Sequence, residues 1–239
     1  MANTKSIDFE SSSSQYAYIT DANQTGLDLS GDFTIEWWQK LETLPSVAGN
    51  SYAVLTKFTT SQAYRILLLD TGKLQVYVSG DGTSTNRDYW TSTNDYVGVG
   101  TWVHYAVTYD LSEREFTVYQ NGEAFAGSTT KNGTVSAINN SSDPVYIGAY
   151  GTGPSLYFDG LIDEVRVWSD VRTPTEIADN YDKEDPAGDN LVAYWKFNDS
   201  ALDETANDND LTLVNSPVYS TDVPFSGGVS RRGGFMAFF

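Results

Sequence analysis

The chain carries an acidic residue inside a segment that is otherwise suited to burial. Residues 160–168 are Gly-Leu-Ile-Asp-Glu-Val-Arg-Val-Trp. An acidic group among hydrophobic neighbours on an inward strand face is costly unless a charged or hydrogen-bonding group meets it. Asp163 is therefore predicted to be either a hydrogen-bonded structural carboxylate or a cation ligand. Strand alternation places these residues on two faces: Ile162, Glu164, Arg166 and Trp168 on one, and Leu161, Asp163, Val165 and Val167 on the other.

Two segments combine aromatic rings with polar side chains, as sugar-binding loops do. Residues 81–90 are Asp-Gly-Thr-Ser-Thr-Asn-Arg-Asp-Tyr-Trp, and residues 150–157 are Tyr-Gly-Thr-Gly-Pro-Ser-Leu-Tyr. Aromatic faces can stack on sugar C–H surfaces while polar groups bind the hydroxyls, commonly from loops at one end of a scaffold. Ordinary strand and loop packing is the alternative for both segments. The predicted carbohydrate ligands are Asp81, Asn86, Arg87, Tyr89, Trp90, Tyr150 and Tyr157.

The sequence contains few groups for catalysis. His104 is the only histidine and there is no cysteine, so a zinc site with two imidazole ligands and thiol chemistry are both excluded. A lone histidine within a strand pattern is more often structural than a general base. The sequence also lacks nucleophile-elbow, phosphate-loop and dinucleotide-binding glycine motifs. We therefore predict that the protein is not an enzyme.

These candidate residues must be positioned by strands, because strand-like runs recur along the chain and helical patterns are almost absent. Tight-turn signals separate several runs, as in Asp70-Thr-Gly-Lys73 and Gln120-Asn-Gly-Glu123. Numerous strands without helices favour an all-β, two-sheet antiparallel sandwich. The expected strands are Ser6–Phe9, Gln15–Ile19, Phe33–Gln39, Tyr52–Phe58, Tyr64–Asp70, Lys73–Ser79, Trp102–Asp110, Glu115–Gln120, Val145–Ala149 and Gly160–Trp168.

One short helix and a β extension are expected after the last of these strands. Thr173-Pro-Thr-Glu176 has the residues of a capping box with proline at the first helical position, which predicts a helix over Pro174–Tyr181. The charged stretch Asp182–Asn190 is predicted to be a linker. Leu191–Phe197 and Leu211–Val214 are expected to pair with each other and to pack on the main body or on a neighbouring subunit.

The last segment differs in kind from the rest of the chain. Residues 226–239 join glycines to two arginines and three phenylalanines in an otherwise acidic protein. Termini of this composition normally fray. If this one is ordered, its rings need a partner, so we expect a docking tail that joins protein partners in a homo-oligomer or a larger assembly. The tail residues concerned are Arg231, Arg232, Phe235, Phe238 and Phe239.

Four separated phrases resemble the laminin-G-like family of concanavalin A-like lectins and glucanases. They are Ser6–Glu10 with Tyr16–Ile19; Leu27–Trp38; Thr101–Asp110 with Val118–Gly122; and Tyr146–Ala149 with Phe158–Trp168. Their order and spacing agree with the family across roughly residues 5–181. The resemblance implies a jelly roll over residues 1–182 and an incomplete second repeat over 183–225. The docking tail predicted from composition then occupies residues 226–239. The resemblance does not fix a function, because one fold can host many.

The resemblance also implies a calcium site and bears on catalysis. In this family calcium often bridges the final strand to the first, held by the aspartate that corresponds to Asp163 and by backbone carbonyls, and calcium prefers such oxygen ligands. Asp8, Glu10 and Asp32 are further candidate ligands by their positions in the matching phrases. Glucanases of this fold carry a compact Glu-x-Asp-x-x-Glu strand for retaining cleavage, and this chain has none.

Composition limits the partners and the place of synthesis. Asp and Glu total 32 against 14 Lys and Arg, a net charge of −18. That balance argues against nucleic acid as a partner, which needs a basic surface. No apolar signal region and no membrane-spanning stretch is present in the sequence, so we expect synthesis in a cytoplasm and release by another route, such as a virus particle.

The favoured function is therefore a non-catalytic glycan-binding or adhesion module, displayed as a structural subunit of a larger assembly. A surface, decoration or fibre protein of a virus particle is the expected setting. The alternatives are a free-standing soluble lectin-like protein and, more remotely, an unusual glycoside hydrolase.

Overall fold

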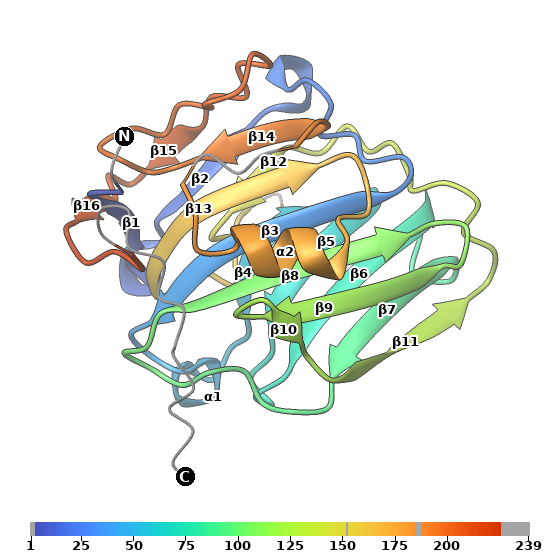
Figure 1. Ribbon diagram of the computed structural model, residues 1–239, viewed down its shortest axis with the longest axis horizontal. Coiled ribbons are helices and arrows are strands. Elements are labelled where there is room, and N and C mark those ends of the chain that lie inside the picture. Colours follow the sequence, from blue (N-terminus) through green and yellow to red (C-terminus); the bar gives the residue numbers. More distant parts are fainter. Residues whose placement is uncertain (1–2, 152, 185–187, 226–239) are drawn as a thin grey trace, which may run out of the picture.

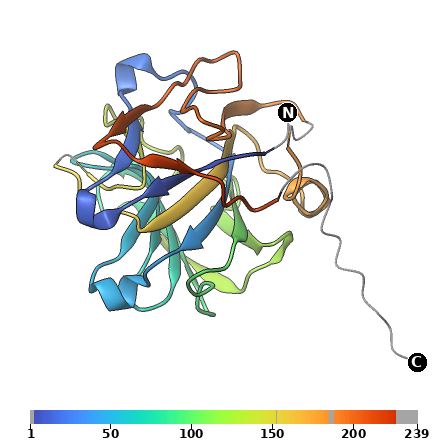
Figure 2. The same ribbon diagram turned by 90° about the vertical axis from the view of Figure 1, so that its left-hand side faces the viewer.

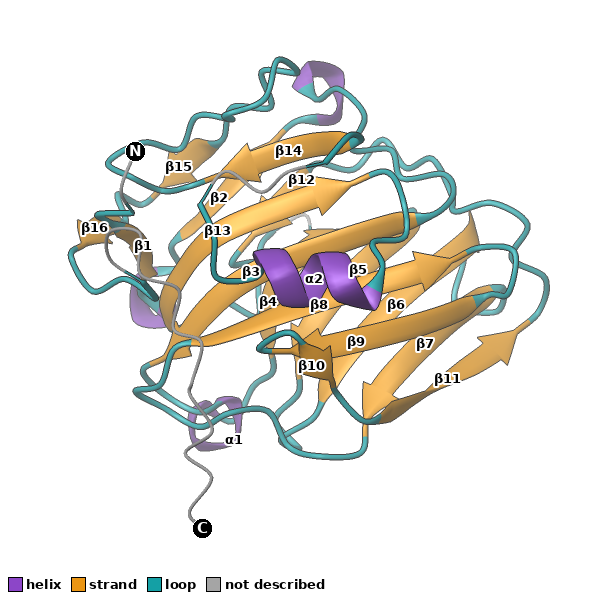
Figure 3. Ribbon diagram, viewed as in Figure 1, coloured by secondary structure: helices purple, strands orange, loops and turns teal. Residues whose placement is uncertain are grey.

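The computed structural model describes residues 3–151, 153–184 and 188–225. Two antiparallel eight-stranded sheets form a sandwich, so the predicted jelly-roll fold is confirmed (Figure 3). In the described residues, no helix is both long and apolar enough to cross a membrane.

The first sheet, called sheet A, has the order β10-β9-β8-β3-β13-β1-β16, and β14 also pairs with β13. Figure 2 shows β1, β13 and β16 side by side, although they come from opposite ends of the chain. The strands of sheet A are β1 (Ser6–Phe9), β3 (Phe33–Leu41), β8 (Val103–Asp110), β9 (Glu115–Gln120), β10 (Glu123–Ala124), β13 (Gly160–Trp168), β14 (Leu191–Trp195) and β16 (Val218–Ser220).

The second sheet, called sheet B, has the order β11-β7-β6-β5-β4-β12-β2-β15. Its register is continuous enough that one row of directly opposed residues crosses all eight strands. Its strands are β2 (Tyr16–Ile19), β4 (Tyr52–Lys57), β5 (Gln62–Leu68), β6 (Leu74–Gly82), β7 (Arg87–Ser92), β11 (Gly127–Asn132), β12 (Val145–Ile147) and β15 (Thr212–Val214).

Helix α2 (Pro174–Asn180) lies across the outer face of sheet A (Figure 1). The Thr173 hydroxyl accepts from the Glu176 amide, and the Glu176 carboxylate accepts from the Thr173 amide, so the predicted capping box is present. Ile177 is buried against Ala106 and Tyr119, which fixes the helix on β8 and β9. The remaining helical segments are short: η1 (Ser11–Ser13), η2 (Asp21–Asn23) and α1 (Pro45–Ala48).

The C-terminal strands extend both sheets of the sandwich. β14 pairs with β13 in sheet A, whereas β15 pairs with β2 in sheet B. The expectation that Leu191–Phe197 and Leu211–Val214 pair with each other was therefore wrong. Each segment meets a free strand edge of the main body, which hydrogen-bonds its backbone more completely than an isolated hairpin would.

A β-bulge in β13 also corrects the simple alternation predicted for residues 160–168. The register with β3 shifts between Asp163 and Arg166, and Glu164 has a φ of 51°. The bulge lies where the other edge of β13 passes from β1 to β14. One extra residue reverses the facing of those that follow. The residues that reach the core are consequently Ile162, Val165 and Val167.

Candidate functional site

The outer face of sheet B carries an uninterrupted row of aromatic and polar side chains. In each strand, the residues that alternate with core residues such as Leu55, Ile66, Val76 and Ile147 face outward. Strand register aligns the outward residues one opposite another across the sheet. We call this set the tyrosine–arginine row: Thr130, Tyr89, Tyr77, Arg65, Thr56, Tyr146, Tyr18 and Thr212.

Two arginines stack on the rings of this face. The Arg65 guanidinium lies 4.7 Å from the Phe58 ring centroid and 4.8 Å from that of Tyr77. The Arg87 guanidinium lies 5.6 Å from the Tyr77 ring and 5.2 Å from the Tyr89 ring. Tyr77 thus stands between two cations. Cation–π contacts of this kind hold the guanidinium groups against the rings of this face.

A second group of rings continues the face toward β2. Tyr18 stacks on Tyr146 with ring centroids 6.1 Å apart, and Tyr16 lies 5.9 Å from Tyr146. Tyr157 approaches Tyr16 from the loop before β13, at 6.2 Å. Tyr16, Tyr18 and Tyr157 are all partly exposed. Rings with one exposed face beside hydroxyl groups are the surface that a sugar ring requires.

A separate hollow of about 210 Å³ lies over sheet A beside α2. The indole N–H of Trp38 donates to the Tyr181 carbonyl at 2.9 Å, and that of Trp102 donates to Asp222 Oδ1 at 2.8 Å. Both polar edges are therefore engaged within the protein. The hollow is lined by Trp38, Trp102, Asn121, Tyr181, Asp182, Pro224 and Phe225.

Asp163 is a buried, hydrogen-bonded carboxylate. It has no exposed surface, accepts from Asn3 Nδ2 at 2.8 Å, and accepts from the Glu164 amide at 2.9 Å. Burial, together with the charge of Glu164, raises the pKa of Asp163 well above its usual value. These contacts correspond to the hydrogen-bonded alternative predicted for Asp163.

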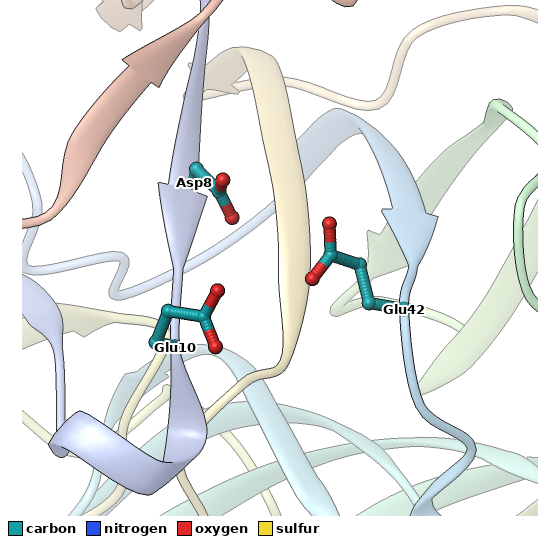
Figure 4. Close-up of side chains that lie close together, drawn as sticks. All are labelled: Asp8, Glu10 and Glu42. Carbon is teal, nitrogen blue, oxygen red and sulfur yellow. The ribbon is translucent and has the colours of Figure 1, made fainter.

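A cluster of three carboxylates comes from β1, from the residue after it and from the residue after β3. One oxygen each from Asp8, Glu10 and Glu42 lie within 4.8 Å of one another, and Figure 4 shows the three side chains pointing together from β1 and the end of β3. Burial, followed by the charges of Glu42, Glu10 and Asp159, raises the pKa of Asp8 to about 6. Calcium–oxygen distances of about 2.3–2.6 Å place ligand oxygens up to ~5 Å apart across the ion, so the spacing suits this cation.

The sequence matches the concanavalin A-like lectin/glucanases superfamily over residues 11–178. The chain belongs to this superfamily. No curated protein matches it. The matched region contains β2 to β13 and therefore most of both sheets.

Solved structures share the superfamily fold. A Bacteroides ovatus protein for which carbohydrate binding is suggested is 23% identical, with a TM-score of 0.68; the match covers 96% of this chain and 63% of that one. A heptameric SAP-like pentraxin from Limulus polyphemus is 13% identical, with a TM-score of 0.59, over 91% and 94% of the two chains. A Ruminococcus gnavus IT-sialidase CBM40 bound to α2,3-sialyllactose is 15% identical, with a TM-score of 0.56, over 74% and 96%.

The superfamily fold separates the residues predicted to bind carbohydrate. Arg87 and Tyr89 lie on the outer face of sheet B, and Tyr150 joins them through Arg65, whose guanidinium lies 5.9 Å from the Tyr150 ring. Tyr157 belongs to the rings around Tyr16. The segment 81–90 is partly β6 and β7 rather than a loop, since Asp81 and Gly82 end β6 and β7 begins at Arg87.

Trp90 was predicted to bind carbohydrate, and this prediction was wrong. It faces inward from β7, is 2% exposed and packs in the core, where an ideal Cβ added to Gly127 would lie 2.1 Å from its ring. It cannot stack on a ligand. Asp81 and Asn86 serve their own loops: Asp81 accepts from the amide and hydroxyl of Thr83, and Asn86 packs against Gly80 and Gly133.

The predicted cation ligands do not come together as one set. Asp8 and Glu10 share the carboxylate cluster with Glu42, which the sequence did not suggest. Asp32 accepts from the Leu111 amide just before β3, eight residues from the end that flanks Asp8, or about 26 Å along an extended strand. Asp8 and Asp32 therefore cannot bind the same ion, and the prediction of a shared site was wrong. Calcium binding itself stays a prediction.

Proposed function

We propose that this protein is a non-catalytic glycan-binding module that holds its ligand on the outer face of sheet B. The tyrosine–arginine row is the observation that carries the proposal, because it places ring faces, hydroxyls and a guanidinium group on one surface. A carbohydrate ligand is also supported by two proteins of similar fold, the Bacteroides protein for which carbohydrate binding is suggested and the CBM40 domain bound to sialyllactose. The indole edges at the hollow over sheet A are engaged internally, which makes that site the poorer candidate.

The test is a glycan panel followed by calorimetry on variants from the two ends of the row. Tyr89→Ala and Tyr18→Ala each remove a partly exposed ring, and each is expected to weaken binding about tenfold, or about 1.4 kcal/mol. Trp102→Ala removes an aromatic ring at the hollow over sheet A and serves as the matched control. Absence of any glycan ligand, or binding that both tyrosine variants retain while Trp102→Ala loses it, contradicts the proposal.

Glycoside hydrolysis has one observation in its favour. The carboxylate oxygens of Asp8, Glu10 and Glu42 approach within 4.8 Å, and the raised pKa of Asp8 resembles that of a general acid. The cluster lies on sheet A, however, whereas the tyrosine–arginine row lies on sheet B. Release of reducing sugar that Asp8→Asn abolishes would support this alternative, whereas a glycan bound without turnover supports the module.

Display on a larger assembly, such as a virus particle, remains part of the proposal. The residues predicted to dock, Arg231, Arg232, Phe235, Phe238 and Phe239, lie outside the described residues. Deleting residues 226–239 should abolish incorporation into the assembly and leave glycan binding unchanged. A truncated protein that still assembles removes this part of the proposal only.

A further inference from the structure

We propose that the glycan carries a carboxylate, and that Arg65 and Arg87 bind it. This inference rests on the proposed function and names the class of sugar. It follows from how these two arginines differ from the other arginines of the described chain.

The two arginines form a local positive site in an acidic protein. They stack on the same ring, that of Tyr77, and the charge of Arg87 is among the causes that lower the pKa of Arg65, after burial. Two like charges placed together are unfavourable unless an anion offsets them. The net charge of −18 makes such a concentration of positive charge unusual here.

The chain supplies that anion to its other arginines. Of the five arginines in the described residues, Arg114 pairs with Asp88, Arg166 with Glu164, and Arg172 with Asp170 and Glu176. Among the described residues, no carboxylate lies within ion-pair distance of Arg65 or Arg87. The ion pairs therefore divide the arginines by position: those without one lie on the outer face of sheet B.

The acidic residues nearest in sequence to Arg87 are directed elsewhere. Asp88 points into the sandwich, where it accepts from Arg114 Nη2 at 2.6 Å and from the Tyr109 hydroxyl at 2.6 Å. Asp81 accepts from its own loop at Thr83. The alternation of β7 thus exposes the cation of Arg87 and buries the adjacent anion.

The donors of these arginines are also incompletely used within the protein. Arg65 Nη2 donates to Gln75 Oε1 at 3.2 Å, and the buried Nε atoms of both Arg65 and Arg87 have no acceptor among the described residues. A guanidinium offers five N–H donors in a planar fork that matches a carboxylate. Rings for the sugar face and a fork for its acid group then lie on one surface, as an acidic monosaccharide requires.

The test is calorimetry with acidic oligosaccharides and their neutral counterparts. The probes are α2,3-sialyllactose, its methyl ester, lactose, digalacturonic acid and its dimethyl ester. At least one acid should bind tenfold or more tightly than its own ester, and the sialylated and uronic pairs distinguish the two sources of the carboxylate. Arg65→Gln and Arg87→Gln should each remove that preference, and Arg87→Lys should keep only part of it.

Lys131→Gln is the matched control, because it removes one positive charge from sheet B at a side chain that pairs with Glu115. It should leave the preference unchanged, and thermal midpoints should show that all variants fold. Equal binding of acids and esters, with Tyr89→Ala still weakening both, overturns this inference but leaves the proposed function. If neither these probes nor any other glycan binds, both this inference and the proposed function are overturned.

Discussion

The outer faces of the two sheets each contain a row of opposed residues that includes an arginine. The two arginines differ in whether a carboxylate pairs with them. In sheet A, Arg166 lies directly opposite Glu36 and Tyr194, has no exposed surface, and donates to Glu164 at 2.8 Å. In sheet B, Arg65 lies opposite Tyr77 and Thr56 and meets rings and an amide instead of a carboxylate.

The two arginines differ because the chain covers the outer face of sheet A at Arg166 and leaves that of sheet B partly exposed at Arg65. Helix α2 and the segment after it close over sheet A, and the carbonyls of Asn180 and Lys183 accept from Arg166. A charge enclosed in this way must be paired, because the energy of an isolated buried ion is prohibitive. The partly exposed Arg65 can remain without a counter-ion in the free protein. The comparison teaches that the chain itself supplies the counter-ion of the arginine on one face, whereas on the other face it leaves the arginine to the proposed ligand.

The largest expected effect comes from breaking the pair under α2. Arg166→Met leaves Glu164 buried without its cation and should lower the free energy of unfolding by about 3–5 kcal/mol. Arg65→Met, the matched variant on sheet B, leaves no buried carboxylate unpaired and should cost less than about 1 kcal/mol. Urea denaturation of both variants measures the difference. Equal losses would show that the two arginines have the same structural role.

A substitution at Trp90 tests whether the proposed ligand face includes this residue. Trp90→Phe should lower the free energy of unfolding by about 2 kcal/mol, because it shrinks a core side chain that covers Gly127. Glycan affinity, measured under conditions where the variant is folded, should stay within twofold of the wild type. Loss of affinity with unchanged stability would restore Trp90 to the binding site.

The carboxylate cluster should produce a smaller effect that depends on pH. The folded-state pKa of Asp8 is raised to about 6 from 3.8, so folding favours its protonated form. The ionised form of Asp8 lowers the stability of the fold. This unfavourable contribution is absent below about pH 4, grows between about pH 4 and pH 6, and is fully present above about pH 6. Asp8→Asn should therefore stabilise the protein by about 1 kcal/mol at pH 8, after allowance for solvent screening, and hardly at all at pH 4.

Calcium provides the sharper version of the same test. If the cluster binds the ion, millimolar CaCl2 raises the thermal midpoint of the wild type at pH 8, and a chelator reverses the change. Asp8→Asn should lose that response, whereas Asp32→Asn, at the other end of β3, should keep it. A calcium response that survives in Asp8→Asn places the ion elsewhere, and no response in the wild type contradicts calcium binding.

Local patterns in the sequence predicted the parts of this molecule that local interactions determine. The bounds of β1, β9 and β13 and the capping box at Thr173 agree with the structure because strand alternation and helix capping act over a few residues. The bulge at Glu164 escaped prediction, since it depends on the change of partner along the edge of β13.

Predicting the proposed binding face would have required the register between distant strands. Arg65, Tyr77 and Tyr146 are unremarkable in their own segments and form one surface only when β5, β6 and β12 align. For Tyr89 and Trp90 the signal was available: Arg87, Tyr89 and Thr91 alternate with Asp88, Trp90 and Ser92, a strand pattern that separates the two rings. Interpreting the segment as a loop placed both on one surface.

The most direct test of the central claim is an NMR titration of the intact protein with the tightest-binding oligosaccharide from the panel. Side-chain and amide resonances of Arg65, Tyr77, Arg87 and Tyr89 are predicted to shift with a common dissociation constant, while those of Trp38, Trp102 and Tyr181 stay in place. Shifts confined to the hollow over sheet A, with the outer face of sheet B unchanged, would contradict the account.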